Sequence, residues 1–340
     1  DVTCYNMVIG VLARGGKREL AEGLLTQMQE DGVSPDTVTF SSLIVPADGE
    51  QKPSQAADWL SAMQQAGVSP DLLCFNKVLA SFGRSRLPEL AEEWLDRMEG
   101  AGIAPNLVSY STAVAAYART AQPDEAMRVL NRMRAAGISP DVVTYNAVID
   151  ANARAGRLLQ AQALLNKLER GEAGAETAAD VVSYTILISA MARRGKLQEA
   201  NKLLSHLQRN TTVTPDTPCF NALIGGYASR GMWGAVSRLM GQMAQSGVRP
   251  DPYTYGPLLE SCRKAGHRQR ARRYGKEMLL VKDLPLSPFC MASLRKTLGN
   301  TQLQQLCREC DVPWRDVEKV IARNAQEQEE RRNRAAGLEL

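Results

Sequence analysis

Small polar residues recur at two fixed positions along this chain, and their side chains could carry the chemistry of hydrogen-bond recognition. Apolar residues surround the first of these two positions, which Asn6 and Asn146 occupy. A buried polar group without a partner costs on the order of 1–3 kcal/mol, so we expect these side chains to lie on an open face that awaits a partner. One set of small donors and acceptors per step is what reading successive base edges requires. The first set is Asn6, Ser41, Asn76, Ser111, Asn146, Thr185 and Asn221, and the second is Asp36, Asp71, Asn106, Asp141, Asp180, Asp216 and Asp251.

These residues recur because most of the chain is one repeated unit. Met28, Met63, Met98 and Met133 are 35 residues apart, and prolines and alanines follow the same step. The first set then occupies the fifth position of each repeat and the second set occupies the last position. We divide the chain into repeats 2–36, 37–71, 72–106, 107–141, 142–180, 181–216, 217–251 and 252–286, with extra residues near 172–177 and 211.

Each repeat is predicted to be a pair of short helices. Tyr145, Val148 and Ile149 have the spacing of one amphipathic helix, and Gly156 should end it. A second apolar stripe follows from Leu158 to Leu168. Neither helix could bury its stripe alone, so the hairpins should stack into an all-α solenoid with a right-handed superhelical course. In the second repeat, Pro46 should end the first helix early and Gly49 takes the thirteenth position.

The pattern weakens toward the carboxyl end. Residues 287–323 are predicted to form a degenerate ninth hairpin and a capping helix that begins near Trp314. Residues 324–340 are so polar that they should be either a solvated helix or a disordered tail. The methionine column and the aromatic fourth position of each repeat are interpreted as core.

Composition excludes few functions. The net charge of +4 permits a polyanionic partner but does not argue for one, and no apolar run approaches the roughly 18 residues of a membrane span. The seven scattered cysteines favour a reducing compartment, and three of them, Cys4, Cys74 and Cys219, share a repeat position typical of small apolar packing. The chain begins without Met and in register with the repeat, so we expect a transit peptide, further repeats, or both before it.

Catalytic signatures are not apparent in the sequence. Cys307 and Cys310 form a lone CxxC pair, and a structural zinc site needs four ligands. The zinc deaminase pattern is missing, because neither His206 nor His267 precedes a Glu by two residues. No Gly-rich phosphate loop or Ser–His–Asp arrangement is evident. We therefore predict a protein that is not an enzyme and that uses no metal or cofactor.

The paired helices at period 35, the Tyr145-Asn146 opening and the closing run Gly32-Val33-Ser34-Pro35-Asp36 closely resemble the pentatricopeptide repeat. The resemblance covers residues 2–251 well and 252–310 weakly, and the plain 35-residue repeats look like the P class of the family. It implies binding of single-stranded RNA in a mitochondrion or chloroplast.

The family's recognition code implies a target sequence. Asn followed by Asp would favour uracil, Ser or Thr followed by Asp guanine, and Asn followed by Asn cytosine. Carried over repeat by repeat in parallel orientation, the predicted core is 5′-UGYGUGU-3′. The resemblance also implies that apolar second-position residues sandwich each base, namely Val38, Leu73, Val108, Val143 and Val182; Thr3, Pro218 and Tyr253 depart from this pattern.

A basic thirteenth residue can face the phosphate backbone in this family. Such contacts would make binding depend on salt. The seventh repeat departs from the pattern with Ser229, although Arg230 stands beside it. The residues at this position are Arg14, Arg84, Arg119, Arg154, Arg193 and Lys264.

Simpler interpretations stay open at each position. The last residue could only cap the next helix, the fifth-position Asn could be satisfied within the fold, and the thirteenth-position cations could be solvated helix ends. For the whole chain, the alternative to sequence-selective RNA binding is an architectural subunit of an organellar ribosome or transcription complex, bound to protein or ribosomal RNA.

Overall fold

The computed structural model describes residues 1–44, 54–172, 178–210, 213–281 and 284–335. All secondary structure in these residues is helical, which confirms the all-α prediction. Pro46, Gly49 and the predicted insertions at 173–177 and 211 lie outside the described residues. None of the helices in these ranges is long and apolar enough to cross a bilayer.

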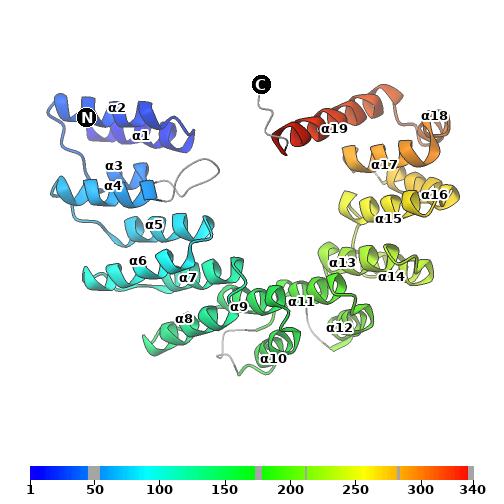
Figure 1. Cartoon of the computed structure of the whole chain (residues 1–340), viewed down its shortest axis with the longest axis horizontal. Helices are drawn as coiled ribbons and strands as arrows, with labels where there is room; N and C mark the ends of the chain where they lie inside the picture. The colour runs from blue at the N-terminus through cyan, green and yellow to red at the C-terminus, as the bar shows by residue number, and fades with distance from the viewer. Residues whose placement is uncertain (45–53, 173–177, 211–212, 282–283, 336–340) are drawn as a thin grey trace. The chain divides into compact units, whose positions relative to one another are not determined.

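Helices occur in pairs that follow the 35-residue period (Figure 1). The first helices of the repeats are α1 (Val2–Arg14), α3 (Thr37–Leu43), α5 (Leu72–Arg84), α7 (Leu107–Arg119), α9 (Val142–Ala155), α11 (Val181–Arg193), α13 (Thr217–Ala228) and α15 (Pro252–Lys264). The second helices are α2 (Arg18–Glu30), α4 (Ser54–Gln65), α6 (Pro88–Gly100), α8 (Pro123–Ala135), α10 (Leu158–Glu169), α12 (Leu197–Asn210), α14 (Trp233–Gln245) and α16 (Arg268–Leu280).

The chain divides into two compact units, an N-terminal unit (Asp1–Ile186) and a C-terminal unit (Leu187–Leu340). In the N-terminal unit, α1, α3, α5, α7 and α9 contact one another in succession, and each contacts the second helix of its own repeat. The second helices α4, α6 and α8 also contact the first helix that follows them. Each hairpin therefore covers the apolar side of the next one, as a solenoid requires.

In the C-terminal unit, α13, α15, α17 (Pro288–Leu298) and α19 (Trp314–Ala335) contact one another in succession. The short helix α18 (Asn300–Glu309) packs beside α17 as a second helix would. Helix α19 extends from Trp314 to Ala335. Of the two alternatives for the polar tail, a helix or a disordered segment, residues 324–335 therefore form a helix.

The core is the seam between first and second helices. Met28, Met63, Met98 and Met133 are fully buried, and the fourth-position aromatics of repeats two to eight are at most 2% exposed. Both columns are therefore confirmed as core. The prediction for Cys4 is wrong: Cys74 and Cys219 are buried as expected, but Cys4 is exposed on α1.

The turn between paired helices has a left-handed residue at the same position in every repeat whose turn the structure describes. Gly156 ends α9 in the left-handed conformation at φ 88°, where glycine meets no steric cost. Arg86 and Ala121 hold the equivalent positions at φ 57°. The turn is therefore fixed by the packing of the helices, even where a side chain makes it unfavourable.

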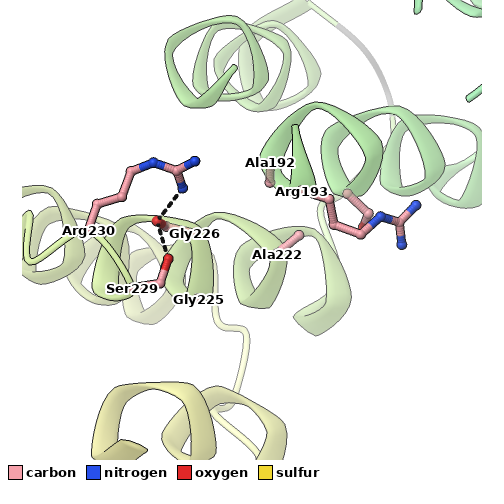
Figure 2. Close-up of a pocket in the computed structure, with 8 residues that line it drawn as sticks. Ala192, Arg193, Ala222, Gly225, Gly226, Ser229 and Arg230 are labelled. Carbon is pink, nitrogen blue, oxygen red and sulfur yellow. Dashed lines mark hydrogen bonds between the residues drawn. The ribbon is translucent and has the colours of Figure 1, made fainter. Parts of the chain in front are cut away.

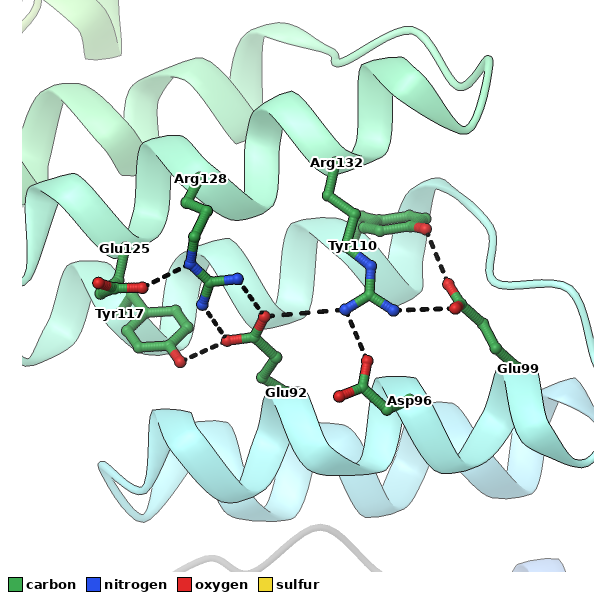
Figure 3. A network of polar contacts seen from close by, with 8 residues as sticks. All are labelled: Glu92, Asp96, Glu99, Tyr110, Tyr117, Glu125, Arg128 and Arg132. Carbon is green, nitrogen blue, oxygen red and sulfur yellow. Dashed lines mark hydrogen bonds and ion pairs between the residues drawn. The ribbon is translucent and has the colours of Figure 1, made fainter.

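A network of charges joins successive repeats in the N-terminal unit (Figure 3). Glu92 of α6 accepts two hydrogen bonds from Arg128 of α8, at 2.7 and 2.5 Å, and a third from the Tyr117 hydroxyl at 2.6 Å. Arg132 bridges Asp96 and Glu99 beside it. Burial alone would raise the pKa of Glu92, but the bonds from Arg128 and Tyr117 and the charge of Arg132 outweigh burial and lower it.

Candidate nucleic-acid interface

The last residue of each of the first seven repeats caps the first helix of the next repeat. Asp36 accepts a hydrogen bond from the Thr39 amide at 2.8 Å, with the backbone of Asp36 extended as an N-cap requires. Distances of 2.7–3.1 Å join the other six last residues to the equivalent amides. The capping role is therefore present in all seven. It also places each of these side chains at the amino end of a first helix.

The fifth-position Asn is held in the same place. Asn6 Nδ2 donates to Asp36 Oδ1 at 3.1 Å, and the Thr39 hydroxyl donates to Asn6 Oδ1 at 2.6 Å. Burial alone would raise the pKa of Asp36, but the hydrogen bonds from Thr39 and Asn6 outweigh it and leave the pKa below its usual value. The carboxylate thus accepts hydrogen bonds from the Thr39 amide and from Asn6 Nδ2 on its inner side.

The hydroxyl contact recurs at the three other Asn repeats, and the amide–carboxylate contact recurs at two of them. Asn146 and Asn221 each donate to the last Asp of their repeat at 3.0 Å. The hydroxyls of Ser109, Ser183 and Thr254 donate to the Oδ1 atoms of Asn76, Asn146 and Asn221 at 2.7, 2.6 and 2.6 Å. No buried side-chain nitrogen or oxygen of the described chain lacks a partner. The fifth-position Asn side chains therefore have hydrogen-bond partners within the fold, which is the simpler interpretation that the sequence left open.

Ser and Thr at the fifth position behave differently. The hydroxyls of Ser41 and Thr185 donate back to the carbonyls of Val38 and Val181 in their own helices, at 3.2 and 2.8 Å. Ser111 instead shares a hydrogen bond of 2.6 Å with the hydroxyl of Thr144. The fifth position therefore makes two kinds of hydrogen bond. An Asn amide bonds to residues outside its own helix, whereas a Ser or Thr hydroxyl bonds mainly to a carbonyl of its own helix.

The second-position residues form a row of exposed apolar side chains in the N-terminal unit. Val38, Leu73, Val108, Val143 and Val182 are 47–64% exposed. Each stands in the first turn of a first helix, three residues before the fifth position. The methionine and aromatic columns of the same repeats are buried, so this column differs from them in its exposure. Exposed apolar groups that recur beside polar ones mark an interaction surface.

The thirteenth-position arginines lie at the other end of the first helices. Arg14, Arg84, Arg119 and Arg154 are all exposed in the N-terminal unit. Partial burial and the charges of Arg84 and Arg154 lower the pKa of Arg119, so these three cations lie close enough to repel one another. Some of their charge is used locally, since Arg154 pairs with Asp150 at 2.6 Å. The arginines therefore form a basic row that is separate from the polar clusters.

In the C-terminal unit a pocket of about 680 Å³ lies between α11 and α13 (Figure 2). Arg193 and Arg230 both line it. The guanidinium of Arg230 donates to the Gly226 carbonyl at 3.1 Å, and Ser229 donates to the same oxygen at 2.9 Å. Arg230 therefore brings a cation to this pocket although the thirteenth residue of its repeat is Ser229. Lys264, in the eighth repeat, is exposed and 3.9 Å from Glu260.

Sequence reasoning missed the third position of each repeat. Thr39, Ser109, Thr144, Ser183 and Thr254 are at most 1% exposed, and all but Thr144 hold a fifth-position Asn. The mixture of Ser, Thr and Cys at this position was the available signal. Considering only its cysteines suggested that the position was used for apolar packing. Side chains of the described residues place no three His, Cys, Asp or Glu groups where they could hold a metal ion.

Stacked helix pairs with one polar cluster per repeat define an α-solenoid repeat protein. Comparison with models of protein families identifies the type of repeat. A model described as "Pentatricopeptide repeat-containing protein" matches residues 71–207, and one described as "PPR repeat family" matches residues 1–45 and 215–264. This chain belongs to the pentatricopeptide repeat family.

Solved structures show the same fold. The pentatricopeptide repeat protein PPR10 from maize is 20% identical, with a TM-score of 0.56 over 100% of this chain and 54% of that one. PPR10 in complex with an 18-nt psaJ RNA element is 24% identical, with a TM-score of 0.51 over 81% of this chain and 44% of that one. The chain thus spans about half the length of these structures. None of the curated proteins compared matches the sequence.

Proposed function

We propose that this protein binds single-stranded RNA in a sequence-selective way, one base per repeat, with the core target 5′-UGYGUGU-3′. The fifth and last residues of the first seven repeats would read the bases, and the second-position residues would contact the base faces. The thirteenth-position cations would contact phosphates. The proposed role is binding rather than catalysis, acting in transcript stabilisation, processing or translation.

The row of exposed apolar side chains in the N-terminal unit carries this proposal. Five successive repeats each place an aliphatic side chain in solvent, in the same first turn that holds the polar cluster. The fold gains nothing from that exposure, because burying such a side chain is worth about 1.5–3 kcal/mol. A flat, partly apolar ligand with a hydrogen-bonding edge would use both features at once. A nucleobase in a single strand is such a ligand.

RNA binding is also what the family and its solved members suggest. The maize relative was solved with an RNA element bound, and a shared fold alone does not transfer a target. Location in a mitochondrion or chloroplast is proposed on the family resemblance, and cell fractionation would test it.

The proposal is tested by a gel-shift titration of the whole chain. The designed RNA contains 5′-UGUGUGU-3′ in a neutral flank, and the control contains the same bases scrambled, at about 150 mM salt because phosphate contacts weaken as salt rises. We expect the designed site to bind at least about tenfold more tightly, which corresponds to about 1.4 kcal/mol. Equal binding of the two RNAs would refute base reading by these residues.

A second candidate, an architectural role in a large complex, is favoured by α16. This second helix carries Arg268, Arg270, Arg272, Arg273 and Lys276 against Glu277 alone. A basic second helix lies outside the proposed base-reading turn and would suit a polyanionic or acidic docking partner. Stable association with a large organellar complex after RNase treatment would favour this candidate, whereas release by RNase would favour binding through RNA.

A further inference from the structure

The third residue of a repeat varies together with the fifth residue of the repeat before it. Where the fifth residue is Asn, the third residue of the next repeat has a hydroxyl; where it is Ser41 or Thr185, that third residue is a cysteine, and Ser111 is followed by Thr144. The four Asn pairs are Asn6 with Thr39, Asn76 with Ser109, Asn146 with Ser183, and Asn221 with Thr254.

The contacts give a physical reason for this association. In all four Asn pairs the hydroxyl donates to the amide oxygen at 2.6–2.7 Å, and the hydroxyl-bearing residue is fully buried. In three of them the amide nitrogen donates to the last Asp. A carboxylate can only accept hydrogen bonds, so the nitrogen must face it and the oxygen must face the hydroxyl. The two partners therefore fix the amide at both ends.

A fixed amide presents a defined pattern to a ligand. One of its two N–H groups is used by the Asp, and the second can donate outward. The carboxylate has about four acceptor sites and keeps part of this capacity. An outward donor beside an acceptor complements the adjacent carbonyl and N3–H of uracil. If the amide could turn, this pattern would be lost.

We propose that the third residue of the following repeat is a positioning residue for base recognition, because its hydroxyl sets the orientation of a preceding Asn. Recognition of one base then depends on three side chains, the fifth and last residues of a repeat and the third residue of the next. The inference rests on the proposed RNA-binding function and adds a specificity determinant to it.

The cysteine pairs fit the same account. Burial raises the pKa of Cys74 to about 11, so its thiol stays neutral and is only a weak donor. Ser41 and Thr185 each donate to a carbonyl of their own helix, so their orientation is set within that helix. A cysteine therefore suffices after these residues, whereas an Asn amide requires the hydroxyl.

The test is Ser183→Cys in the whole chain. Cysteine occupies the same buried position in two other repeats, so the fold should accept it, and thermal unfolding checks this. Affinity is measured for four RNAs that carry U, C, G or A at the fifth base, which Asn146 would read, and for four that vary the seventh base, which Asn221 would read. Ser183→Thr keeps a hydroxyl at this position, and Thr254→Cys removes the hydroxyl that contacts Asn221. Cys74→Ser is the control that adds a hydroxyl in the repeat after Ser41, where no Asn is present to be positioned.

We expect Ser183→Cys to reduce the preference for uracil at the fifth base by about fivefold or more and to leave the seventh-base preference unchanged. Thr254→Cys should do the reverse, while Ser183→Thr and Cys74→Ser should keep the wild-type preferences. If wild type discriminates and Ser183→Cys discriminates equally well, the positioning role is wrong although the RNA-binding proposal stands. A uniform loss of affinity at all bases would also overturn it, since that is a structural effect. A wild-type protein without base preference would refute both proposals.

Discussion

An Asn at the fifth position has partners before any RNA arrives, and this changes how its role must be understood. Binding need not satisfy an unpartnered group, because the amide of Asn146 already donates to Asp180 and accepts from Ser183. A base can instead use the second amide N–H and the remaining acceptor sites of the carboxylate, so no existing bond has to break. Affinity at such a site should therefore come from added contacts, and selectivity from the fixed orientation of the amide.

The variant Asn146→Thr should change the preference at the fifth base from uracil to guanine. Thr185 gives the native precedent, since its hydroxyl donates to the carbonyl of Val181 in its own helix. We expect a change of preference of about tenfold, or about 1.4 kcal/mol, in titrations with the four RNAs that vary this base. The double variant with Ser183→Cys copies the Thr185 and Cys219 combination and should bind the guanine RNA at least as well. An unchanged uracil preference would show that the fifth position does not read this base.

At the scale of elements, local signals predicted the helices well, and contacts between repeats were harder to foresee. The first helices α3, α5 and α9 begin at Thr37, Leu72 and Val142, where the period places the starts of repeats. These starts are visible because the cap is only three residues from the amide that it binds. The partner of Asn6 is 33 residues away, and the hydroxyl column reads as ordinary helix sequence. From the sequence, hydrogen bonding of the fifth-position Asn within the fold could therefore be proposed as an alternative, but not established.

Helices α6, α7 and α8 give a prediction for stability. Glu92 is 9% exposed and its pKa is lowered, so it stabilises the fold above its unfolded pKa and loses this contribution as the pH falls through the lower folded value. Glu92→Gln should cost about 2 kcal/mol near neutral pH, because Arg128 loses a charged partner but remains half-exposed. The difference in stability should begin to shrink near the unfolded pKa of about 4.3 and should vanish only below the lower pKa that Glu92 has in the folded protein. Thermal unfolding across this range measures both effects.

Glu93→Gln is the matched control on the same helix. Its carboxylate pairs with Arg97 at 2.6 Å, but both side chains are about half exposed, and such surface pairs contribute about 0–1 kcal/mol. The control should therefore unfold almost as wild type does at every pH. If the two variants lost equal stability, the network around Glu92 would not be the structural link between these repeats.

At the scale of the whole molecule, charge is distributed unevenly among the helices. The chain carries only +4, yet α1, α5, α7 and α9 each have an arginine in the last turn, while α6 carries five acidic residues against Arg97. A polyanion would therefore meet the ends of the first helices and avoid α6. If the arginines contact phosphates, each contact should add about 0.7 to the slope of log affinity against log salt for a single strand.

Arg84→Gln combined with Arg154→Gln should accordingly lower that slope by about 1 to 1.5 and weaken binding of every RNA alike, since phosphates carry no sequence. The matched control is Arg97→Gln combined with Arg170→Gln, which removes the same charge from two exposed residues of second-helix segments. We expect the control to keep the wild-type slope in titrations over a range of salt concentrations. Equal slopes for both double variants would show that only the net charge of the protein matters. If the first variant keeps the wild-type preference among bases, the arginines contact phosphates and do not read bases.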